Sequence, residues 1–423
     1  MSNAGTTPHH TALRQKPAFV LTMLLLVYVF NFIDRQILGI LAGPIMADLH
    51  LDKFQYGLLS GLAFAILYTT MGVPLAWLAD RRGRKAVVAV SLAVWSGFTA
   101  LCGMAGSFGA MFLCRLGVGV GEAGGVAPSY ALIAQVFPPE RRARALAIYS
   151  LGIPIGSALG FLLGGYIAQH VNWRAAFISI GLAGVLFTPI FAMAVREPAA
   201  DTPVQAQAKP SFGAVFAILA RKRAFWLLSF GAGAGSMMGY GLAVWLPSVI
   251  QKAFGLDLVQ TGQFFGFLLL TGGVIGVLAG GYVGDWLGQR NRAAYALMPA
   301  LAYAAGMPFF IAGQFVSSAP VAFALFILPQ ALVYLWLGPV LTAVQHLVPA
   351  PMRATASASF LLINNLIGVG LGAPFIGLLA DRLTPAYGAD ALRYAITLGL
   401  SCYLLAAALM ALASRYLTRE WVD

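Results

Sequence analysis

The sequence predicts an all-α membrane protein with twelve transmembrane helices in two six-helix bundles, and three observations support this fold class. Hydrophobic residues make up 60% of the 423 residues and only 9% are charged, a balance far from that of a soluble domain. Apolar runs of about 20 residues, long enough to cross a hydrocarbon core of about 30 Å as helices, recur along the chain. Related motifs also occupy corresponding places in the two halves.

Charged, proline-rich or glycine-rich breaks separate the twelve predicted spans. The first span is too long and too polar in its middle for a cleavable signal peptide, so we expect it to remain as the first transmembrane helix. Several spans are long enough to require tilt or extension past the bilayer. The predicted ranges are 18–44, 54–79, 86–106, 109–136, 143–169, 173–195, 224–250, 259–284, 293–313, 319–347, 354–381 and 391–416.

The distribution of arginine and lysine predicts that both termini are cytoplasmic. In that orientation 19 of the 26 basic residues lie in inner segments, five lie in outer segments, and Arg35 and Arg115 lie inside spans. This asymmetry satisfies the positive-inside rule. It also accounts for the net charge of +12 without nucleic acid, because the basic residues lie between apolar spans and are not interleaved with aromatic ones. We expect a multi-pass protein of a bacterial inner (plasma) membrane.

The longest hydrophilic connection, residues 196–223, divides the chain in two. Its proline, alanine and glutamine content is typical of a linker, and a short interfacial helix is predicted at Phe212–Arg221. We therefore expect an N-terminal six-helix bundle over residues 1–195, a cytoplasmic linker over 196–223 and a C-terminal six-helix bundle over 224–423.

The two halves carry an internal repeat. Aligning Asp80 with Asp285 also aligns Gly83 with Gly288, at a separation of 205 residues. A second pair of segments, PPERRARA and PAPMRATA, begins 211 residues apart, and each opens a glycine-rich helix. Duplicated six-helix bundles with a site between them are a transporter arrangement.

The stretch Asp80-Arg81-Arg82-Gly83-Arg84-Lys85 closely resembles the signature of the major facilitator superfamily, with Ala76 where a glycine is usual. The resemblance covers nearly the whole chain and implies transport by alternating access, but it says little about the substrate. We expect a gating role for this loop, because its acid can accept hydrogen bonds from a neighbouring helix terminus in one conformation and lose them in another. A purely topological cluster of charges is the alternative. The expected gating residues are Asp80, Arg81, Gly83, Arg84, Asp285 and Arg142.

Within that superfamily, NFIDRQ in the first span and CRLGVGVGEAGGVAPSY at residues 114–130 resemble the spinster family and its bacterial relatives. Animal members are associated with export of sphingolipid-type or lysophospholipid molecules, so the resemblance implies an amphipathic or lipid-like substrate. A neighbouring organic-anion transporter family has a similar Asp-Arg in its first helix. Proton symport of carboxylates therefore remains an alternative, followed by drug:proton antiport.

Four ionisable groups lie deep in the predicted spans: Asp34, Arg35, Arg115 and Glu122. Each should face a cavity or a partner, because a charge in hydrocarbon costs at least about 2.5 kcal/mol. Arg115 and Glu122 are seven residues apart, on nearly the same helix face and about 10 Å apart. Asp34 is the predicted partner of Arg115. Arg35 points about 100° away, toward the substrate or the cytoplasmic mouth.

Proton coupling is the role predicted for Asp34, Glu122 and Arg115. Loss of water favours a protonated carboxyl group and a nearby guanidinium favours the carboxylate, so movement of Arg115 relative to Glu122 would switch its proton affinity. The alternative is a set of static structural contacts. Arg115 and Arg35 are also candidates to bind an anionic group of the substrate, because a planar guanidinium suits phosphate or carboxylate.

The C-terminal half offers aromatic and amide groups in place of buried charge. An apolar wall with a few hydrogen-bonding groups suits an amphipathic ligand, although such residues also serve as packing or interfacial anchors. The substrate-binding candidates here are Tyr240, Trp245, Gln330, Tyr334, Asn364 and Asn365.

A glycine every four residues marks the fifth span. We expect this ridge to be a packing and rocking surface rather than a ligand site, because small residues let helix backbones approach closely. The four positions are Gly152, Gly156, Gly160 and Gly164.

The sequence contains no metal-ligand cluster, no Ser/His/Asp set and no phosphate-cradling loop, so we expect no enzyme activity, no metal and no cofactor. It also contains no Walker-type ATP site, so the energy source is expected to be a proton gradient. The expected partners are a small amphipathic or anionic substrate, protons and the lipid bilayer, with the chain acting as a monomer.

Overall fold

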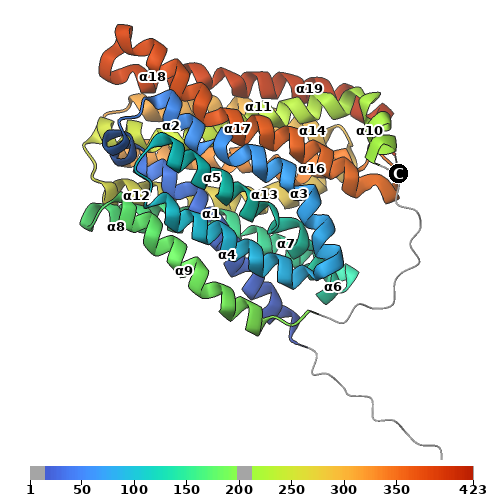
Figure 1. Ribbon diagram of the computed structural model, residues 1–423. Helices are drawn as coiled ribbons and strands as arrows, with labels where there is room; N and C mark the ends of the chain where they lie inside the picture. Colours follow the sequence, from blue (N-terminus) through green and yellow to red (C-terminus); the bar gives the residue numbers. More distant parts are fainter. Residues whose placement is uncertain (1–14, 198–211, 423) are drawn as a thin grey trace, which may run out of the picture.

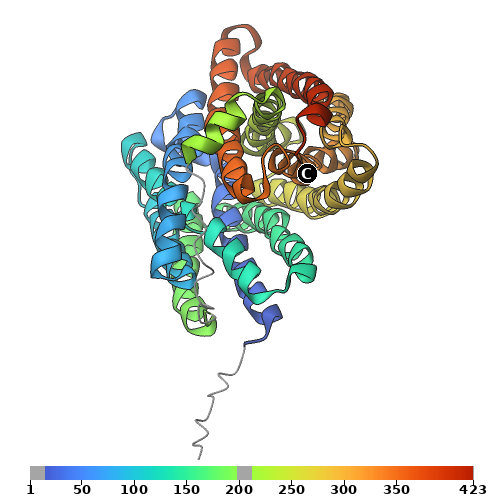
Figure 2. The same ribbon diagram turned by 90° about the vertical axis from the view of Figure 1, so that its right-hand side faces the viewer.

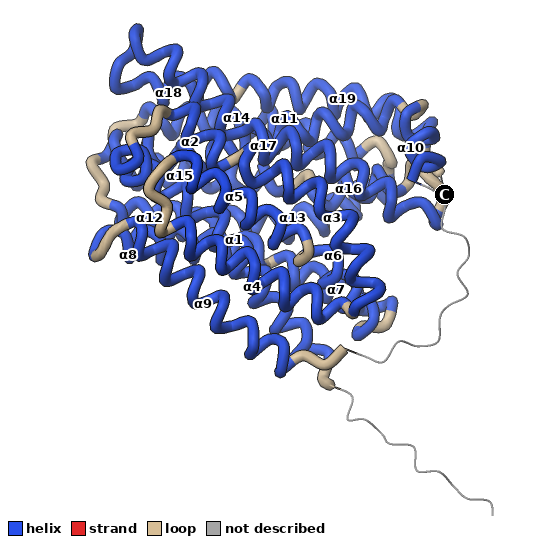
Figure 3. Tube along the Cα trace, viewed as in Figure 1, coloured by secondary structure: helices blue, strands red, loops and turns tan. Residues whose placement is uncertain are grey.

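The structure is a computed structural model, and it describes residues 15–197 and 212–422 (Figure 1). In these residues every regular element is a helix (Figure 3). The all-helical prediction is therefore confirmed.

The first half forms six membrane-spanning units, three of which consist of two consecutive helices. The breaks follow glycine or leucine residues at Gly61, Gly124 and Leu151. The elements are α1 (Pro17–Leu49), α2 (Lys53–Ser60), α3 (Leu62–Arg82), α4 (Arg84–Cys102), α5 (Phe108–Ala123), α6 (Val126–Val136), α7 (Pro139–Ser150), α8 (Gly152–His170) and α9 (Trp173–Ala194).

The second half repeats this pattern after the linker. A short helix, α10 (Phe212–Ala220), matches the helix predicted at the end of the linker. The remaining elements are α11 (Arg223–Phe254), α12 (Leu258–Leu268), the π-helical η1 (Leu269–Gly273), α13 (Val274–Arg290), α14 (Ala294–Phe315), α15 (Ala319–Tyr334), α16 (Leu337–Gln345), η2 (Ala350–Met352), α17 (Arg353–Tyr387), η3 (Gly388–Asp390), α18 (Ala391–Gly399) and α19 (Ser401–Glu420).

Eleven helical runs in the described residues are long and apolar enough to cross a membrane. The last of them, Arg353–Glu420, has 68 residues and reverses direction at η3, so α17 and α18–α19 form two separate spans (Figure 1). The structure thus contains the twelve predicted spans.

The two halves lie side by side, with α1–α9 in one group and α11–α19 in the other (Figure 2). The start of α1 and the end of α19 lie at the same end of the molecule, which we call the terminal end (Figure 1). The other end, which carries the α1–α2, α8–α9, α11–α12 and α17–α18 connections, we call the opposite end.

The glycine ridge of α8 faces α1, as the sequence predicts for a packing surface. A Cβ at Gly156 would collide with the carbonyl oxygen of Val29, and one at Gly160 would come within 2.9 Å of the carbonyl oxygen of Ile33. Gly152 and Gly164 also face α1, where an added Cβ would meet side chains rather than the backbone. The absence of side chains lets α8 approach the backbone of α1 and fixes the helix that carries the central charges.

Gly156→Leu is expected to destabilise the protein, because α8 would have to move away from α1. Overpacking of this kind costs about 1–3 kcal/mol or more, which thermal unfolding in detergent, followed by tryptophan fluorescence, would detect. Gly97→Leu on α4 is the matched control, since no atom of the described residues lies within 4 Å of the added Cβ. An equal loss in both variants would contradict the packing role of the ridge.

Candidate functional site

A buried ion pair joins α1 to α5 at the centre of the first bundle. Arg35 Nε donates a hydrogen bond to Glu122 Oε2 at 2.7 Å, and the two side chains are 9% and 0% exposed. Glu122 lies one residue before the end of α5, where Gly124 and Gly125 interrupt the helix. Such a charge-assisted bond is short and strong, particularly away from water.

Three aromatic rings surround the guanidinium of Arg35. Its Cζ lies 5.1 Å from the ring centroid of Phe32, 4.8 Å from that of Phe64 and 4.6 Å from that of Tyr68. Cation–π attraction adds to the ion pair in a desolvated site. Phe64 and Tyr68 were not singled out from the sequence, because nothing in the second span distinguishes them from ordinary core residues.

Asp34 does not pair with Arg115, so this prediction from the sequence is wrong for the conformation described here. Among the described residues Asp34 forms no ion pair, although it is only 2% exposed. Its carboxylate lies beside Thr99 of α4 and interacts electrostatically with Glu122 and Arg115. The side chain of Arg35 is longer than that of Asp34 and reaches α5, whereas Asp34 faces α4.

Arg115 is buried without an acidic partner at ion-pair distance in the described residues. It is 1% exposed, its Nε donates to the carbonyl oxygen of Leu59 at 3.4 Å, and its Cζ lies 5.3 Å from the Phe64 ring. A fully buried guanidinium is costly unless an anion or several acceptors compensate its charge. Arg115 is therefore suited to receive an anionic group.

The two oxygens of the Glu122 carboxylate have different surroundings. Oε2 accepts from Arg35, whereas Oε1 is buried and meets no donor in good hydrogen-bond geometry in the described part of the chain, with the Asn31 side chain as the polar group beside the carboxylate. The side-chain oxygen of Asn31 on α1 is also buried without a partner. Buried acceptors without donors are uncommon and costly. Oε1 of Glu122 is therefore the oxygen at which a proton would be gained with least loss.

A small cavity of about 20 Å³ lies between the two bundles beside these groups. Arg35 and Arg115 line it from the first half, and Tyr240 and Val369 from the second. This volume holds about one water molecule. Tyr240 is thus the C-terminal substrate candidate that the structure brings to the central charges.

Two other candidates from the second half are satisfied within their own bundle. The indole of Trp245 is fully buried and donates to the carbonyl oxygen of Ala373 at 2.9 Å. The side-chain oxygen of Asn364 accepts from the Ser236 hydroxyl at 2.9 Å, and its amide nitrogen lies 3.4 Å from the side-chain oxygen of Asn365. These contacts give Trp245 and Asn364 a packing role in this conformation.

The remaining candidates, Gln330 and Tyr334, lie on α15 beside the π-helical turn η1. A Cβ at Gly272 would meet the side chain of Gln330, and one at Gly273 would approach the ring of Tyr334. Single π-helical turns inside longer helices occur frequently at functional sites. Gln330 and Tyr334 do not line the small central cavity.

The loop predicted to act in gating is held within the first half. Asp80 accepts from Arg84 at 3.2 Å, and the guanidinium of Arg81 lies 3.8 Å from the ring centroid of Trp77. Gly83 has a φ of 95°, which favours glycine because it lacks a Cβ. Asp80 bonds to its own loop here.

Glu197, rather than Asp80, caps the neighbouring helix. Its carboxylate accepts from the backbone amides of Arg84 at 2.7 Å and Lys85 at 3.2 Å, at the start of α4. Arg142, at the next loop of the terminal end, donates to the carbonyl oxygen of Phe137 at 3.0 Å. The side chain of Asp285 lies outside the described part of the structure. Glu197 was missed because it follows the last predicted span of the first half, 112 residues from Lys85.

Comparison with known proteins places these features in a family. The sequence profile of the Major Facilitator Superfamily matches residues 24–373. The chain is 32% identical over 394 residues, 91% of each protein, to an MFS-type efflux pump of Mycolicibacterium smegmatis. It is 28% identical over 301 residues to a probable L-galactonate transporter of Escherichia coli, which covers 68% of this chain and 66% of the relative.

A solved structure is also similar over the whole chain. It is a bacterial homologue of the human lysosomal transporter Spinster in an inward-facing and unoccupied conformation. The two structures superpose with a TM-score of 0.84 at 27% sequence identity, over 99% of this chain and 100% of the homologue.

Proposed function

Because this chain belongs to the major facilitator superfamily and is a multi-pass secondary transporter, we propose that it couples proton movement to the transport of an amphipathic, lipid-like molecule with an anionic group. The observation that carries the proposal is the buried Arg35–Glu122 pair, whose second carboxylate oxygen meets no donor in good hydrogen-bond geometry among the described residues. We place both termini in the cytoplasm and treat residues 1–195 and 224–423 as the two moving bundles, joined by the linker 196–223.

The proton step follows from competition for Arg35. An anionic ligand that reaches Arg35 draws its guanidinium away from Glu122, and the carboxylate then lies in an apolar site without its cation. Taking a proton removes the buried charge. When the ligand leaves, Arg35 returns and the proton is released. Asp34 and Arg115 bias this exchange through their charges, since both interact electrostatically with the same group of side chains.

The substrate class follows from the surroundings of the two arginines. Phe32, Phe64 and Tyr68 supply apolar and aromatic surface around Arg35, and Tyr240 adds a hydroxyl from the other bundle. A ligand with an anionic head and an apolar body fits this combination. The resemblance to the spinster family, whose animal members are associated with export of sphingolipid-type or lysophospholipid molecules, favours a lipid-like body.

A small organic anion is the second candidate. Arg115 lines the central cavity without an acidic partner at ion-pair distance among the described residues, and a probable L-galactonate transporter is among the relatives. Export of a drug-like molecule comes third and draws support from the similarity to an efflux pump.

The substrate test uses purified protein in liposomes with an imposed pH gradient. Lysolipids, sphingoid lipids and small carboxylates are offered separately, and movement of each across the bilayer is measured. Faster movement of a lysolipid or sphingoid lipid than of any carboxylate supports the lipid-like assignment. Transport restricted to small carboxylates would replace it with the organic-anion function.

Arg115→Ala is expected to weaken binding of the anionic substrate identified in that screen by about tenfold to a hundredfold. The reason is that a charge-assisted hydrogen bond to a buried guanidinium contributes about 1.5–3 kcal/mol. Isothermal titration calorimetry in detergent would measure the change. Arg174→Ala, which removes a cation at the opposite end, is the control. Unchanged affinity in Arg115→Ala would exclude contact between this side chain and the anionic group.

A further inference from the structure

The two bundles meet at the opposite end through two docking units that repeat each other. In one unit the start of α2 packs against the end of α17, and in the other the start of α12 packs against the end of α8. Asp52 and Gln55 form a capping box at the start of α2, and Asp257 and Gln260 form the same box at the start of α12. The separation of 205 residues is that of the motif repeat in the sequence.

Glycines bring each unit into backbone contact. A Cβ at Gly377 on α17 would collide with the carbonyl oxygen of Lys53, and one at Gly165 on α8 with the carbonyl oxygen of Leu258. Lys53 and Leu258 each directly follow the capping aspartate of their helix. The first turns of α2 and α12 thus contact the backbone of the other bundle. Close packing at these glycines closes the opposite end in both units.

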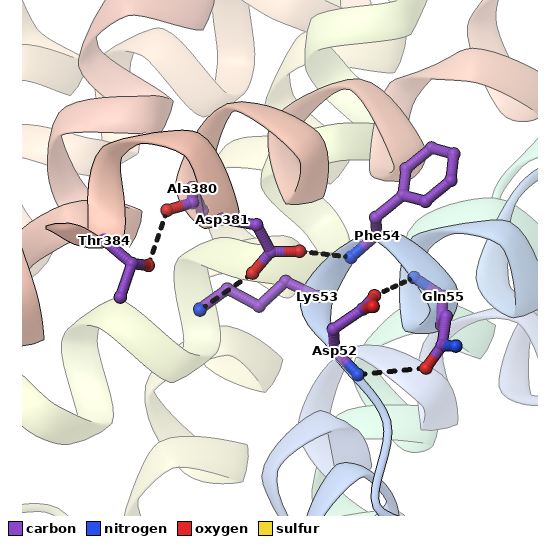
Figure 4. Close-up of polar contacts among 7 residues, drawn as sticks. All are labelled: Asp52, Lys53, Phe54, Gln55, Ala380, Asp381 and Thr384. Carbon is purple, nitrogen blue, oxygen red and sulfur yellow. Dashed lines mark hydrogen bonds and ion pairs between the residues drawn. The ribbon is translucent and has the colours of Figure 1, made fainter.

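The polar contacts of the two units differ. Asp381 on α17 accepts from Lys53 Nζ at 3.1 Å through one oxygen and from the Phe54 amide at 2.9 Å through the other (Figure 4). At the corresponding place on α8, the side-chain oxygen of Gln169 accepts from the Leu258 amide at 3.3 Å. One unit therefore carries a charge at its centre, and the other carries a neutral amide.

The charged contact is added to the ordinary cap of α2. Asp52 accepts from the amide of Gln55, and the side chain of Gln55 accepts from the amide of Asp52 (Figure 4). Asp381 satisfies a further amide of the same first turn from the other bundle. The negative charge of Asp381 is stabilised by the dipole at the N-terminus of α2 and by the ammonium group of Lys53. The Lys53 and Asp381 side chains are 30% and 29% exposed, so water screens the contact only in part.

Opening of the opposite end would separate these partners. Phe54 would exchange a carboxylate for water at its amide, and Lys53 and Asp381 would each lose an opposite charge. The α8–α12 unit would lose one neutral hydrogen bond. The electrostatic cost of opening therefore falls mainly on the α2–α17 unit, although the backbone packing of the two units is similar.

We propose that Asp381 is a latch between the bundles, which sets the balance between closed and open forms of the opposite end through Lys53 and the first turn of α2. The α8–α12 unit closes by packing and contributes little to that balance through charge. This inference rests on the alternating-access part of the proposed function and is independent of the proton step and of the substrate.

The test measures a distance across the opposite end. Spin labels are placed at Ala47→Cys on α1 and Ala386→Cys on α17, both exposed, in a background without the three native cysteines. Double electron–electron resonance in lipid nanodiscs then gives the ratio of open to closed forms. Asp381→Asn removes the negative charge but keeps an oxygen that can accept from the Phe54 amide, and it is expected to raise this ratio roughly threefold to tenfold. Lys53→Met should raise it less, because the negative charge of Asp381 at the start of α2 remains.

The matched control is Asp390→Asn, which makes the same change of charge at the same end. Asp390 lies 3.7 Å from Arg393 within one bundle, so the ratio should stay at the wild-type value. Gln169→Ala should change it less than Asp381→Asn, and Asp381→Glu should restore part of the closure. An unchanged ratio in Asp381→Asn, or a larger effect of Gln169→Ala, would overturn the proposal.

The measurement needs neither substrate nor a pH gradient. The ratio of open to closed forms can therefore be interpreted even if transport assays show no proton coupling. An unchanged ratio in Asp381→Asn would contradict the latch but not the proposed function. Size-exclusion profiles of each variant show whether the fold is retained. Asp381→Glu supplies a folded comparison if Asp381→Asn is unstable.

Discussion

Glu122→Gln is expected to abolish accumulation driven by a pH gradient while leaving exchange of substrate across the membrane. Glutamine has nearly the same shape as glutamate but cannot take up a proton under these conditions. A gradient of one pH unit is worth 1.36 kcal/mol per proton, which supports about tenfold accumulation when one proton moves with one substrate. In liposomes containing the variant, the accumulation ratio should fall to about one.

The control for this experiment is Asp390→Asn, which removes a carboxylate far from the central pair and should keep the wild-type accumulation ratio. Counterflow, in which labelled substrate exchanges for unlabelled substrate without a gradient, shows whether Glu122→Gln still binds and moves its ligand. Full accumulation in Glu122→Gln would remove Glu122 from the proton step. Asp34→Asn, a change at the other buried carboxylate of the site, would then be the next variant to measure.

Arg35→Gln is expected to give a large loss of stability, because it leaves Glu122 buried without its cation. Removing one partner of a buried ion pair costs about 3–5 kcal/mol, whereas replacing both partners by neutral groups can be nearly neutral. The double variant Arg35→Gln/Glu122→Gln should therefore be more stable than Arg35→Gln alone. Thermal unfolding of the single and double variants in detergent, arranged as a double-mutant cycle, measures the coupling.

The pH dependence of Arg35→Gln gives the same test another readout. At about pH 5 the unpaired carboxyl group can be protonated more readily than at about pH 8, so the loss of stability should be larger at the higher pH. Glu122→Gln, which has no carboxyl group at this position, should lack that dependence. Additive effects of the two single changes at both pH values would show that the pair contributes no coupling energy.

The spans could be predicted closely because each depends on local composition. The prediction at 109–136 corresponds to α5 and α6, and the linker helix predicted at Phe212–Arg221 corresponds to α10. A run of apolar residues has few alternatives in a membrane, since its backbone groups must be satisfied within the segment. The sequence did not locate the break between α5 and α6, which follows Glu122.

The sequence singles out the buried charged residues but does not predict how they pair. Asp34, Arg35, Arg115 and Glu122 stand out because charges in apolar spans are rare, and the structure brings all four into one region of the first bundle. Which acid meets which base depends on helix rotation and side-chain length. Asp34 and Arg35 point about 100° apart around the helix axis. A predicted helix rotation that is wrong by one residue therefore exchanges their partners.

The membrane class, the two related halves and the buried charged residues can be predicted from the sequence alone, because they follow from composition, spacing and the cost of placing charge in hydrocarbon. Helix packing selects the pairing of Arg35 with Glu122, the capping of α4 by Glu197 and the contact of Asp381 with the start of α2. These contacts join residues 87, 113 and 327 positions apart. Their partners are chosen by how the helices pack, which no local pattern of residues specifies.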